Sequence, residues 1–265
     1  MGKLYIGNSG STPAIVKIEE VEKKRFGLSG DTFFGDAADG VLQRATAQTA
    51  LNFTGVREIA GSALLYAFYL CPSIKSVNSG SVQSIGNQAL SYAFYRCKGL
   101  TSVDLSSVTT IGSSGLEKAF YDCTGIAGVL DLSSLQSVGY SGLFWTFHNC
   151  TGITSVDLSS LTTVGESGAN SVFDECSGIT SVDLSSLQSV DKSGLSYAFY
   201  QNTSLTAISF PSLTSVHTGG LNNAFSGCTA LTEIHFRTDM QATIEALTTY
   251  DTKFGATNAT IYFDL

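Results

Sequence analysis

The stretch CTGITSVDLSSLTTVG, residues 150–165, returns almost unchanged as CSGITSVDLSSLQSVD at residues 176–191. Related copies lie before and after both, and each is preceded by a landmark aromatic residue. The landmarks are Phe68, Phe94, Phe120, Phe147, Phe173, Phe199 and Phe225. Their spacing is 26 residues, with one extra residue in the third unit. A fixed period between about 20 and 50 residues is typical of a solenoid, in which each unit buries its apolar side chains only against its neighbours.

Each unit is predicted to contain a strand and a short helix. Residues 100–111 follow the pattern L-x-x-V-x-L-x-x-V-x-x-I, and its middle part alternates apolar with polar residues, as strands do. In GLEKAFYDC, residues 115–123, apolar residues recur with helical spacing at Leu116, Ala119, Phe120 and Cys123. Ser114 and Glu117 have the form of a capping box at the start of this predicted helix.

The strand pattern resembles a leucine-rich repeat, and its combination with AF-x-x-C resembles the BspA-like class of bacterial leucine-rich repeat proteins. The resemblance covers roughly residues 51–236 in seven repeats. It implies an α/β solenoid: a right-handed, curved stack of about seven 26-residue strand-loop-short-helix repeats, with a parallel sheet on one side and a cap at both ends. No catalytic residues come with this family. The predicted helix is about one turn longer than the connection usual in this class.

Three parts of the chain follow from these patterns. Residues 50–236 are predicted to form the solenoid. Residues 1–49 are predicted to be an N-terminal cap or attachment segment, with a hairpin around Asn8, Ser9 and Gly10. Residues 237–265 are predicted to be a C-terminal cap, with a helix carrying Met240, Ile244 and Leu247 and a strand in ATIYFDL. Both ends also resemble repeat proteins encoded by gut bacteria and their phages.

The six cysteines stand at one position of the repeat. Each lies three residues after a landmark Phe, at Cys71, Cys97, Cys123, Cys150, Cys176 and Cys228, and Asn202 takes this place after Phe199. No two cysteines form a CxxC pair. A residue type that recurs at one phase predicts a small buried side chain in the stack, in preference to disulfides or a thiolate metal site.

The net charge of −8, with no basic run beyond Lys23, Lys24 and Arg25, argues against a nucleic-acid partner and against basic attraction to membranes. No apolar run approaches the roughly 18 residues that a spanning helix needs, so no membrane insertion is expected. The beginning, MGKLYIGNSGSTPA, lacks the pattern of a signal peptide. We expect a protein of the cell surface, the extracellular space or a virion, although the sequence does not fix the location.

Catalytic motifs are missing from the sequence. His148, His217 and His235 are scattered, and neither HExxH nor GxSxG occurs. GDAADG, residues 35–40, offers Asp36 and Asp39 but lacks the alternating ligands of a calcium loop. We therefore expect no enzyme, no cofactor and no metal site.

Two rows of side chains are candidate ligand surfaces, because a solenoid repeats a residue at each turn. The first, the strand ladder, lies between two inward positions of each predicted strand: Asn78, Asp104, Asp131, Asp157, Asp183, Ser209 and His235. Strands lie about 4.8 Å apart, and two carboxylates at that distance in water repel by about 1 kcal/mol. Such a row should attract a cation or a partner rich in hydroxyl or amine groups. The alternative is an exposed strand face that polar residues merely solvate.

The second row, the aromatic stripe, occupies the positions two before and one after the landmark Phe, which point away from the core on a helical wheel. Its members are Tyr66, Tyr69, Tyr92, Tyr95, Tyr121, Trp145, His148, Tyr197 and Tyr200. Lys118, Ser171 and Asp174 interrupt it. Rows of exposed aromatic residues often mark an interaction surface. The alternative is packing between neighbouring repeats.

The sequence thus predicts a non-enzymatic recognition protein that binds a protein or a cell-surface polysaccharide through one or both rows. The family resemblance implies adhesion to cell-surface or matrix components. Two alternatives stay open: a receptor-binding protein of a phage tail or virion, and a purely structural spacer.

Overall fold

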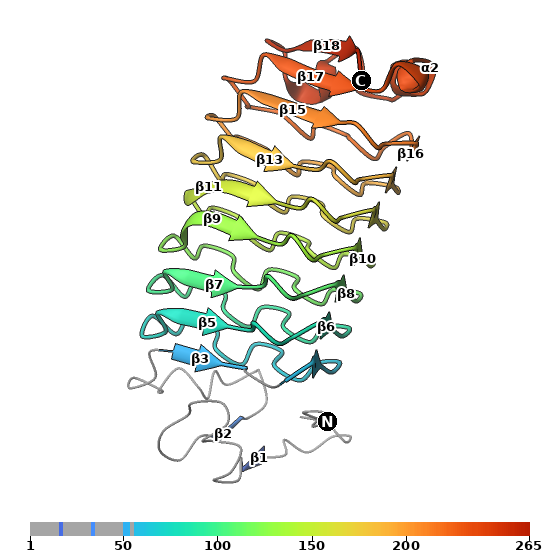
Figure 1. The fold of residues 1–265 in the computed structure, drawn as a ribbon. Helices are drawn as coiled ribbons and strands as arrows, with labels where there is room; N and C mark the ends of the chain where they lie inside the picture. Colours follow the sequence, from blue (N-terminus) through green and yellow to red (C-terminus); the bar gives the residue numbers. More distant parts are fainter. Residues whose placement is uncertain (1–15, 18–32, 35–49, 54–55) are drawn as a thin grey trace.

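The computed structural model describes residues 16–17, 33–34, 50–53 and 56–265 (Figure 1). The predicted hairpin at Asn8–Gly10 and the acidic residues Asp36 and Asp39 lie outside the described residues. From residue 50 onward the chain forms the predicted parallel-sheet solenoid with a period of about 26 residues, in about eight turns where the sequence predicted about seven. Before it, β1 (Val16–Lys17) pairs with β2 (Phe33–Phe34) in antiparallel orientation.

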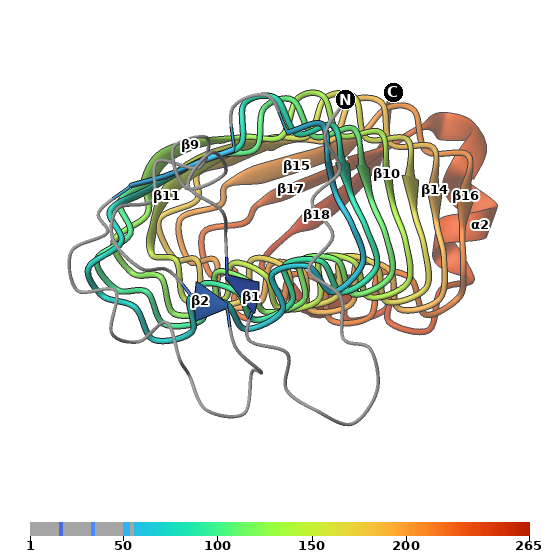
Figure 2. The ribbon, with the colours of Figure 1, turned by 90° about the horizontal axis from the view of Figure 1, so that it is seen from below.

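Each turn over residues 50–216 contributes a strand to two faces of the solenoid, and the last two turns contribute one to the first face only. The first face consists of β3 (Ala50–Asn52), β5 (Ser76–Asn78), β7 (Ser102–Asp104), β9 (Ala127–Asp131), β11 (Gly152–Asp157), β13 (Ser181–Asp183), β15 (Ala207–Phe210), β17 (Glu233–Phe236) and β18 (Thr260–Phe263). The second face is one parallel sheet of β4 (Glu58–Ile59), β6 (Ser84–Ile85), β8 (Thr110–Ile111), β10 (Ser137–Val138), β12 (Thr163–Val164), β14 (Ser189–Val190) and β16 (Ser215–Val216). Figure 2, which looks along the stack, shows these two faces and a third segment surrounding the interior.

The third segment is not the short helix that the sequence predicts. Over residues 60–72 and their equivalents the backbone forms consecutive turns, in which alternate N–H groups bond in two ways. The N–H of Ala67 donates to the carbonyl of Leu64 in its own turn, at 3.1 Å, whereas the N–H of Phe68 donates to Ala93 of the next repeat, at 2.8 Å. Because this ribbon also places residues three and four apart on one side, it produces the same apolar periodicity as a helix.

This ribbon places non-glycine residues in the left-handed region at every fourth position. Ser62, Tyr66 and Leu70 have φ values of 56°, 55° and 57°, and later repeats follow the same pattern. The predicted capping box is therefore wrong, because Ser114 has φ 51° and is part of a turn. The left-handed conformation is unfavourable for L-residues. It is held here by hydrogen bonds to the neighbouring repeat.

The core is a column of landmark rings and thiols. Phe94 stacks on Phe68 and on Phe120 with ring centroids 5.2 and 5.3 Å apart, and stacking continues up to Phe225. All six cysteines are buried free thiols, as predicted. The thiol of Cys97 donates to the carbonyl of Phe68 one repeat earlier at 3.0 Å, and Cys123 donates likewise to Phe94. Most units are thus joined to the preceding one through both the ring and the thiol.

The C-terminal residues form a short helix and a last strand, but of the three residues predicted on the helix only Ile244 lies in it. Residues 238–245 form the 3-10 turn η3 (Thr238–Met240) and the helix α2 (Gln241–Glu245), and a further 3-10 turn is η4 (Lys253–Gly255). Met240, Ile244 and Leu247 are buried against the core. Strand β18 pairs with β17 in parallel and adds a last strand to the first face. No helix in the part of the chain that the structure describes is long and apolar enough to cross a membrane.

Candidate functional site

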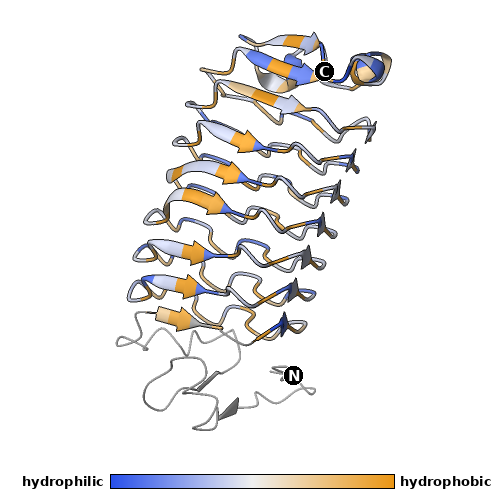
Figure 3. Cartoon of the chain, viewed as in Figure 1, coloured by the Kyte–Doolittle hydropathy of each residue, from blue (hydrophilic) through white to orange (hydrophobic). Residues whose placement is uncertain are grey.

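The strand ladder follows the ends of the strands on the first face, where Figure 3 shows hydrophilic residues. Asp131 is in register with Asp157, and Asp157 with Asp183, on β9, β11 and β13. Asn78 pairs in the same way with Asp104, and Ser209 with His235. The structure therefore brings three carboxylates together on consecutive strands.

These carboxylates also have a local structural role that the sequence reasoning missed. The Oδ1 atom of Asp157 accepts a hydrogen bond from the backbone N–H of Ser159 at 3.0 Å, and Asp183 accepts one from Ser185 at 2.8 Å. Such bonds end a strand in an Asx turn. Hydrogen bonds from the hydroxyl and the N–H of Ser133 lower the pKa of Asp131. The motif D-L-S-S, repeated in the sequence, is the signal that could have predicted these turns.

A shallow hollow of about 400 Å³ lies on this face across β9, β11, β13 and β15. Its walls combine ladder residues with serines and apolar residues: Val129, Ser155, Val156, Asp157, Ser181, Val182, Asp183, Leu184 and Ser209. Val129 is 70% exposed. It pairs with Ser155, so the extra residue of the third unit places an apolar side chain where the neighbouring strand has a serine. The hollow thus offers carboxylates, hydroxyl groups and apolar contacts, of which Val129 is the exposed one.

His235 ends the strand ladder in an acidic setting. Its Nδ1 lies 2.9 Å from Oδ1 of Asp264 and its Nε2 lies 3.4 Å from Oε2 of Glu233. The hydrogen bond with Asp264 is the main cause that raises the pKa of His235 above its usual value. Its ring also stacks on Tyr262 of β18, with centroids 4.8 Å apart.

The aromatic stripe forms two rows on the turn ribbon. The first ring row consists of Tyr66, Tyr92, Lys118, Trp145, Ser171 and Tyr197, and the second ring row consists of Tyr69, Tyr95, Tyr121, His148, Asp174 and Tyr200. In the second ring row the rings stack without a break from Tyr69 to His148, with centroids 4.9, 4.8 and 4.3 Å apart. In the first ring row Tyr66 stacks on Tyr92 at 4.7 Å.

This stacking limits what the stripe can offer to a ligand. Tyr95, with a ring on each side, has no free face, and like most of the stripe it is only half-exposed. Such a ring can present its edge and its hydroxyl group. Tyr197 differs because it is 41% exposed. Its own-repeat partner is Tyr200, in an edge-on contact at 6.1 Å.

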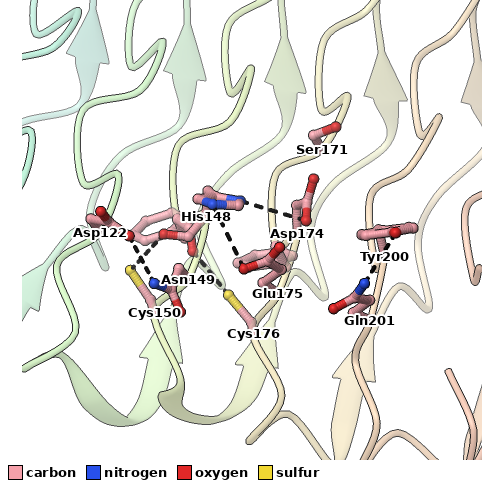
Figure 4. Close-up of polar contacts among 12 residues, drawn as sticks. Asp122, His148, Asn149, Cys150, Ser171, Asp174, Glu175, Cys176, Tyr200 and Gln201 are labelled. Atoms are coloured by element: carbon pink, nitrogen blue, oxygen red, sulfur yellow. Dashed lines mark hydrogen bonds and ion pairs between the residues drawn. The ribbon is translucent and has the colours of Figure 1, made fainter. Parts of the chain in front are cut away.

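Both ring rows are interrupted in the same repeat, at Ser171 and Asp174. Figure 4 shows Asp174 between His148 and Tyr200, with Ser171 beside it. The Nδ1 atom of His148 lies 3.5 Å from Oδ1 of Asp174, and its Nε2 lies 4.0 Å from Oε2 of Glu175. Both His148 Nδ1 and Asp174 Oδ1 are buried without a hydrogen-bond partner.

Among the described residues, no group of three or more His, Cys, Asp or Glu side chains is arranged to hold a metal ion. The cysteine column is unsuited to thiolate chemistry, because burial raises the pKa of each thiol, to about 12 for Cys97 and Cys228.

A BspA type leucine rich repeat region matches the sequence in six copies, over residues 64–168, 90–216 and 117–248. The chain belongs to the BspA-type leucine-rich repeat family. Repeat proteins of this family are generally non-catalytic. Comparison with curated proteins found no match.

Three solved structures illustrate what this BspA-type protein is similar to. A leucine rich repeat protein of T. pallidum is 20% identical, over 68% of this chain and 62% of the other, with a TM-score of 0.33. A leucine rich cell surface protein of Faecalibacterium prausnitzii is 18% identical, over 68% and 70%, with a TM-score of 0.31. Internalin C2 of Listeria monocytogenes is 14% identical, over 91% and 88%, with a TM-score of 0.39. The chain spans less than two thirds of the T. pallidum protein.

Proposed function

We propose that this protein is a non-enzymatic recognition protein of a bacterial or virion surface, which binds a protein or a cell-surface glycan through the first face of its solenoid. The observation that carries the proposal is the hollow of about 400 Å³ on that face. Asp157, Asp183 and Ser209 line it. Its carboxylates and hydroxyl groups suit a ligand rich in amine or hydroxyl groups, because both are good hydrogen-bond acceptors in an open, solvated site.

Charge supports the same ligand chemistry. The net charge of the chain is −8, which favours association with basic or polyhydroxylated partners over acidic ones. Asp131, Asp157 and Asp183 lie on three neighbouring strands in register. Their Oδ1 atoms are engaged in the Asx turns, and a ligand on this face would meet the remaining carboxylate oxygens.

A second candidate function is a structural spacer, and the stacked ring rows favour it. Tyr69, Tyr95 and Tyr121 stack closely enough to explain the stripe as packing between repeats. Under this function the two ends of the chain would make the contacts, and the surfaces between them would bind nothing.

A pull-down distinguishes these functions. Purified protein is incubated with intact gut bacteria and, in parallel, with mammalian matrix proteins. The first variant carries Asp157→Asn and Asp183→Asn, which removes two charges while an amide oxygen can still accept the Asx-turn hydrogen bond. A matched control carries Glu245→Gln and Asp251→Asn, which removes the same charge from exposed residues outside the hollow.

If the protein binds through the first face, the wild type and the control should retain the target, and the Asp157→Asn, Asp183→Asn variant should lose it. A variant with Tyr92, Tyr95, Tyr197 and Tyr200 replaced by Ser tests the stripe in the same assay. Loss of binding in this variant alone, with its fold verified by circular dichroism, would move the site to the stripe. If the wild type retains neither the bacteria nor the matrix proteins, the result would favour the structural spacer.

A further inference from the structure

The first face of the solenoid is interrupted in two places. Among the described strands, pairing joins those of this face in three separate groups, β3–β5–β7, β9–β11–β13 and β15–β17–β18, whereas the second face is one continuous sheet. The breaks therefore lie between β7 and β9 and between β13 and β15. At the inward position in the middle of the strands, Leu130, Val156 and Ile208 are buried. Val103 of β7 and Val182 of β13 occupy the same position beside the breaks and are only half-buried.

Both breaks fall where the sequence departs from the repeat. The unit of β9 contains the extra residue, and Gly128 in it has φ 87°. The unit of β15 replaces D-L-S-S by S-F-P-S at residues 209–212. Pro211 has no backbone N–H, so it cannot donate the Asx-turn hydrogen bond that Ser185 donates to Asp183 at 2.8 Å. The hollow of about 400 Å³ extends across the second break, because its lining continues from β13 to Ser209 of β15.

The hollow has an aliphatic interior and a polar rim. Val156, Val182 and Leu184 line it from the inward side of the strands, and Val129 stands beside them with 70% of its surface exposed. No aromatic side chain is among its lining residues. An exposed valine beside a half-buried one favours a methyl-bearing group, because contact removes apolar surface of both partners from water.

We propose that this hollow holds an aliphatic side chain of a protein partner, with a lysine or arginine of the same partner against Asp157 and Asp183. These two carboxylates lie in register on neighbouring strands, which gives the rim a charge complementary to a cation. A protein surface presents aliphatic and basic side chains next to each other. A glycan presents hydroxyl groups over most of its surface and would leave Val129 and Val182 against polar groups. The inference rests on the proposed function and names the class of partner for the same site.

The pull-down, quantified as an apparent dissociation constant for the retained target, tests the hollow with two variants. Val129→Ser gives β9 the serine that β11 and β13 have at this position, and it should weaken binding about tenfold. Ser209→Trp fills the rim and should weaken binding at least as much. Two matched controls should bind like the wild type. Tyr140→Ser removes another exposed apolar side chain of the same unit, and Ser215→Trp adds the same ring at an exposed position of the second face. Thermal melts verify the fold of all four variants.

A second arm identifies the class of partner. The target is oxidised with periodate, which destroys glycans, or digested with a proteinase before incubation. We expect binding to survive periodate and to be lost after the proteinase. Loss after periodate would assign a glycan and overturn the protein partner. Wild-type affinity in both Val129→Ser and Ser209→Trp would overturn the hollow as the contact, while the binding itself would leave the proposed function standing. If the wild type retains no target, the proposed function fails and the inference fails with it.

Discussion

Replacing Asn202 by cysteine should stabilise the protein. In the other units a thiol donates a hydrogen bond to the landmark Phe carbonyl one repeat earlier, at 2.9–3.3 Å for the cysteines from Cys97 to Cys228. Asn202 performs this role with its amide, which donates to the carbonyl of Phe173 at 3.0 Å. Its second polar atom, Oδ1, is buried and has no hydrogen-bond partner.

The magnitude follows from this difference. An unsatisfied buried acceptor costs about 1–3 kcal/mol, and exchanging the amide donor for a weaker thiol donor loses about 0.5–1 kcal/mol. Asparagine and cysteine have similar volumes, so the substitution leaves little cavity or overpacking. The difference between these ranges is about 0–2.5 kcal/mol, so Asn202→Cys should raise the free energy of unfolding by about 1 kcal/mol. The reverse change, Cys176→Asn, should lower it by a similar amount, because it introduces the same unpaired oxygen.

Urea unfolding under reducing conditions, followed by circular dichroism, measures both variants. The midpoint of Asn202→Cys should move to higher urea concentration with an unchanged slope, since the exposed area on unfolding stays the same. A lower midpoint for Asn202→Cys would refute the reasoning, because it would mean that the amide oxygen is satisfied in solution.

Further expectations concern the turn ribbon and the titrating groups. Gln88 is exposed with φ 55°, so Gln88→Gly should stabilise by about 0.5–1 kcal/mol in urea unfolding, whereas Gln88→Val should destabilise. Burial raises the thiol pKa values, to about 11 for Cys71 and about 12 for Cys97. Below their ordinary pKa of 9.0 the neutral thiols contribute their full stability, and this contribution is lost as the pH rises through the raised values. The urea midpoint should therefore fall between about pH 8 and pH 11. Because the thiols are buried, iodoacetamide should label the native protein far more slowly than the unfolded protein. The hydrogen bond with Asp264 raises the pKa of His235, so the pKa measured for His235 by NMR should lie above the usual 6.5 and should return toward 6.5 in Asp264→Asn. The ion pair stabilises the fold at low pH, and this stabilisation is lost as the pH rises through the raised pKa.

The repeat made most of the fold predictable. One period fixes the neighbours of each residue, so the inward phases of Leu51, Phe53, Val56 and Ile59 could be read from the sequence, and all four are buried. The cysteine column followed from the same logic. A side chain that recurs at one phase meets its own copy, and the copies of Cys97 and Cys123 are indeed buried in the stack.

The helix was predicted wrongly because its periodicity is not unique. Phe68 and Cys71 face inward three residues apart in the turn ribbon, as they would on a helix. The decisive hydrogen bonds, such as that from Phe68 N–H to Ala93, connect residues 25 positions apart. They form only after the next repeat is in place. Local propensity also gives no warning, because residues such as Tyr92 and Gln88 seldom adopt positive φ.

For the candidate surfaces, the sequence predicted which residues face away from the core, and it did not predict the contacts between them. The sequence indicated that Tyr92 and Tyr95 point away from the core, and it left open whether they bind or pack. It gave no distance between Lys118 and the rings on either side. That contact depends on the separation of repeats, which the strand pairing on the other faces determines.

The stacking of identical rows has a consequence for recognition in this solenoid. A perfect repeat covers both faces of each ring with its copies, so regularity stabilises the stack and removes the surfaces that aromatic recognition uses. The ring rows are interrupted where a unit departs from the pattern, as at Lys118, Ser171 and Asp174. On the strand face the same holds for Val129, which the extra residue of the third unit exposes. Specificity should therefore depend on the units that break the repeat, and substitutions in these units should alter binding more than equivalent substitutions in regular ones.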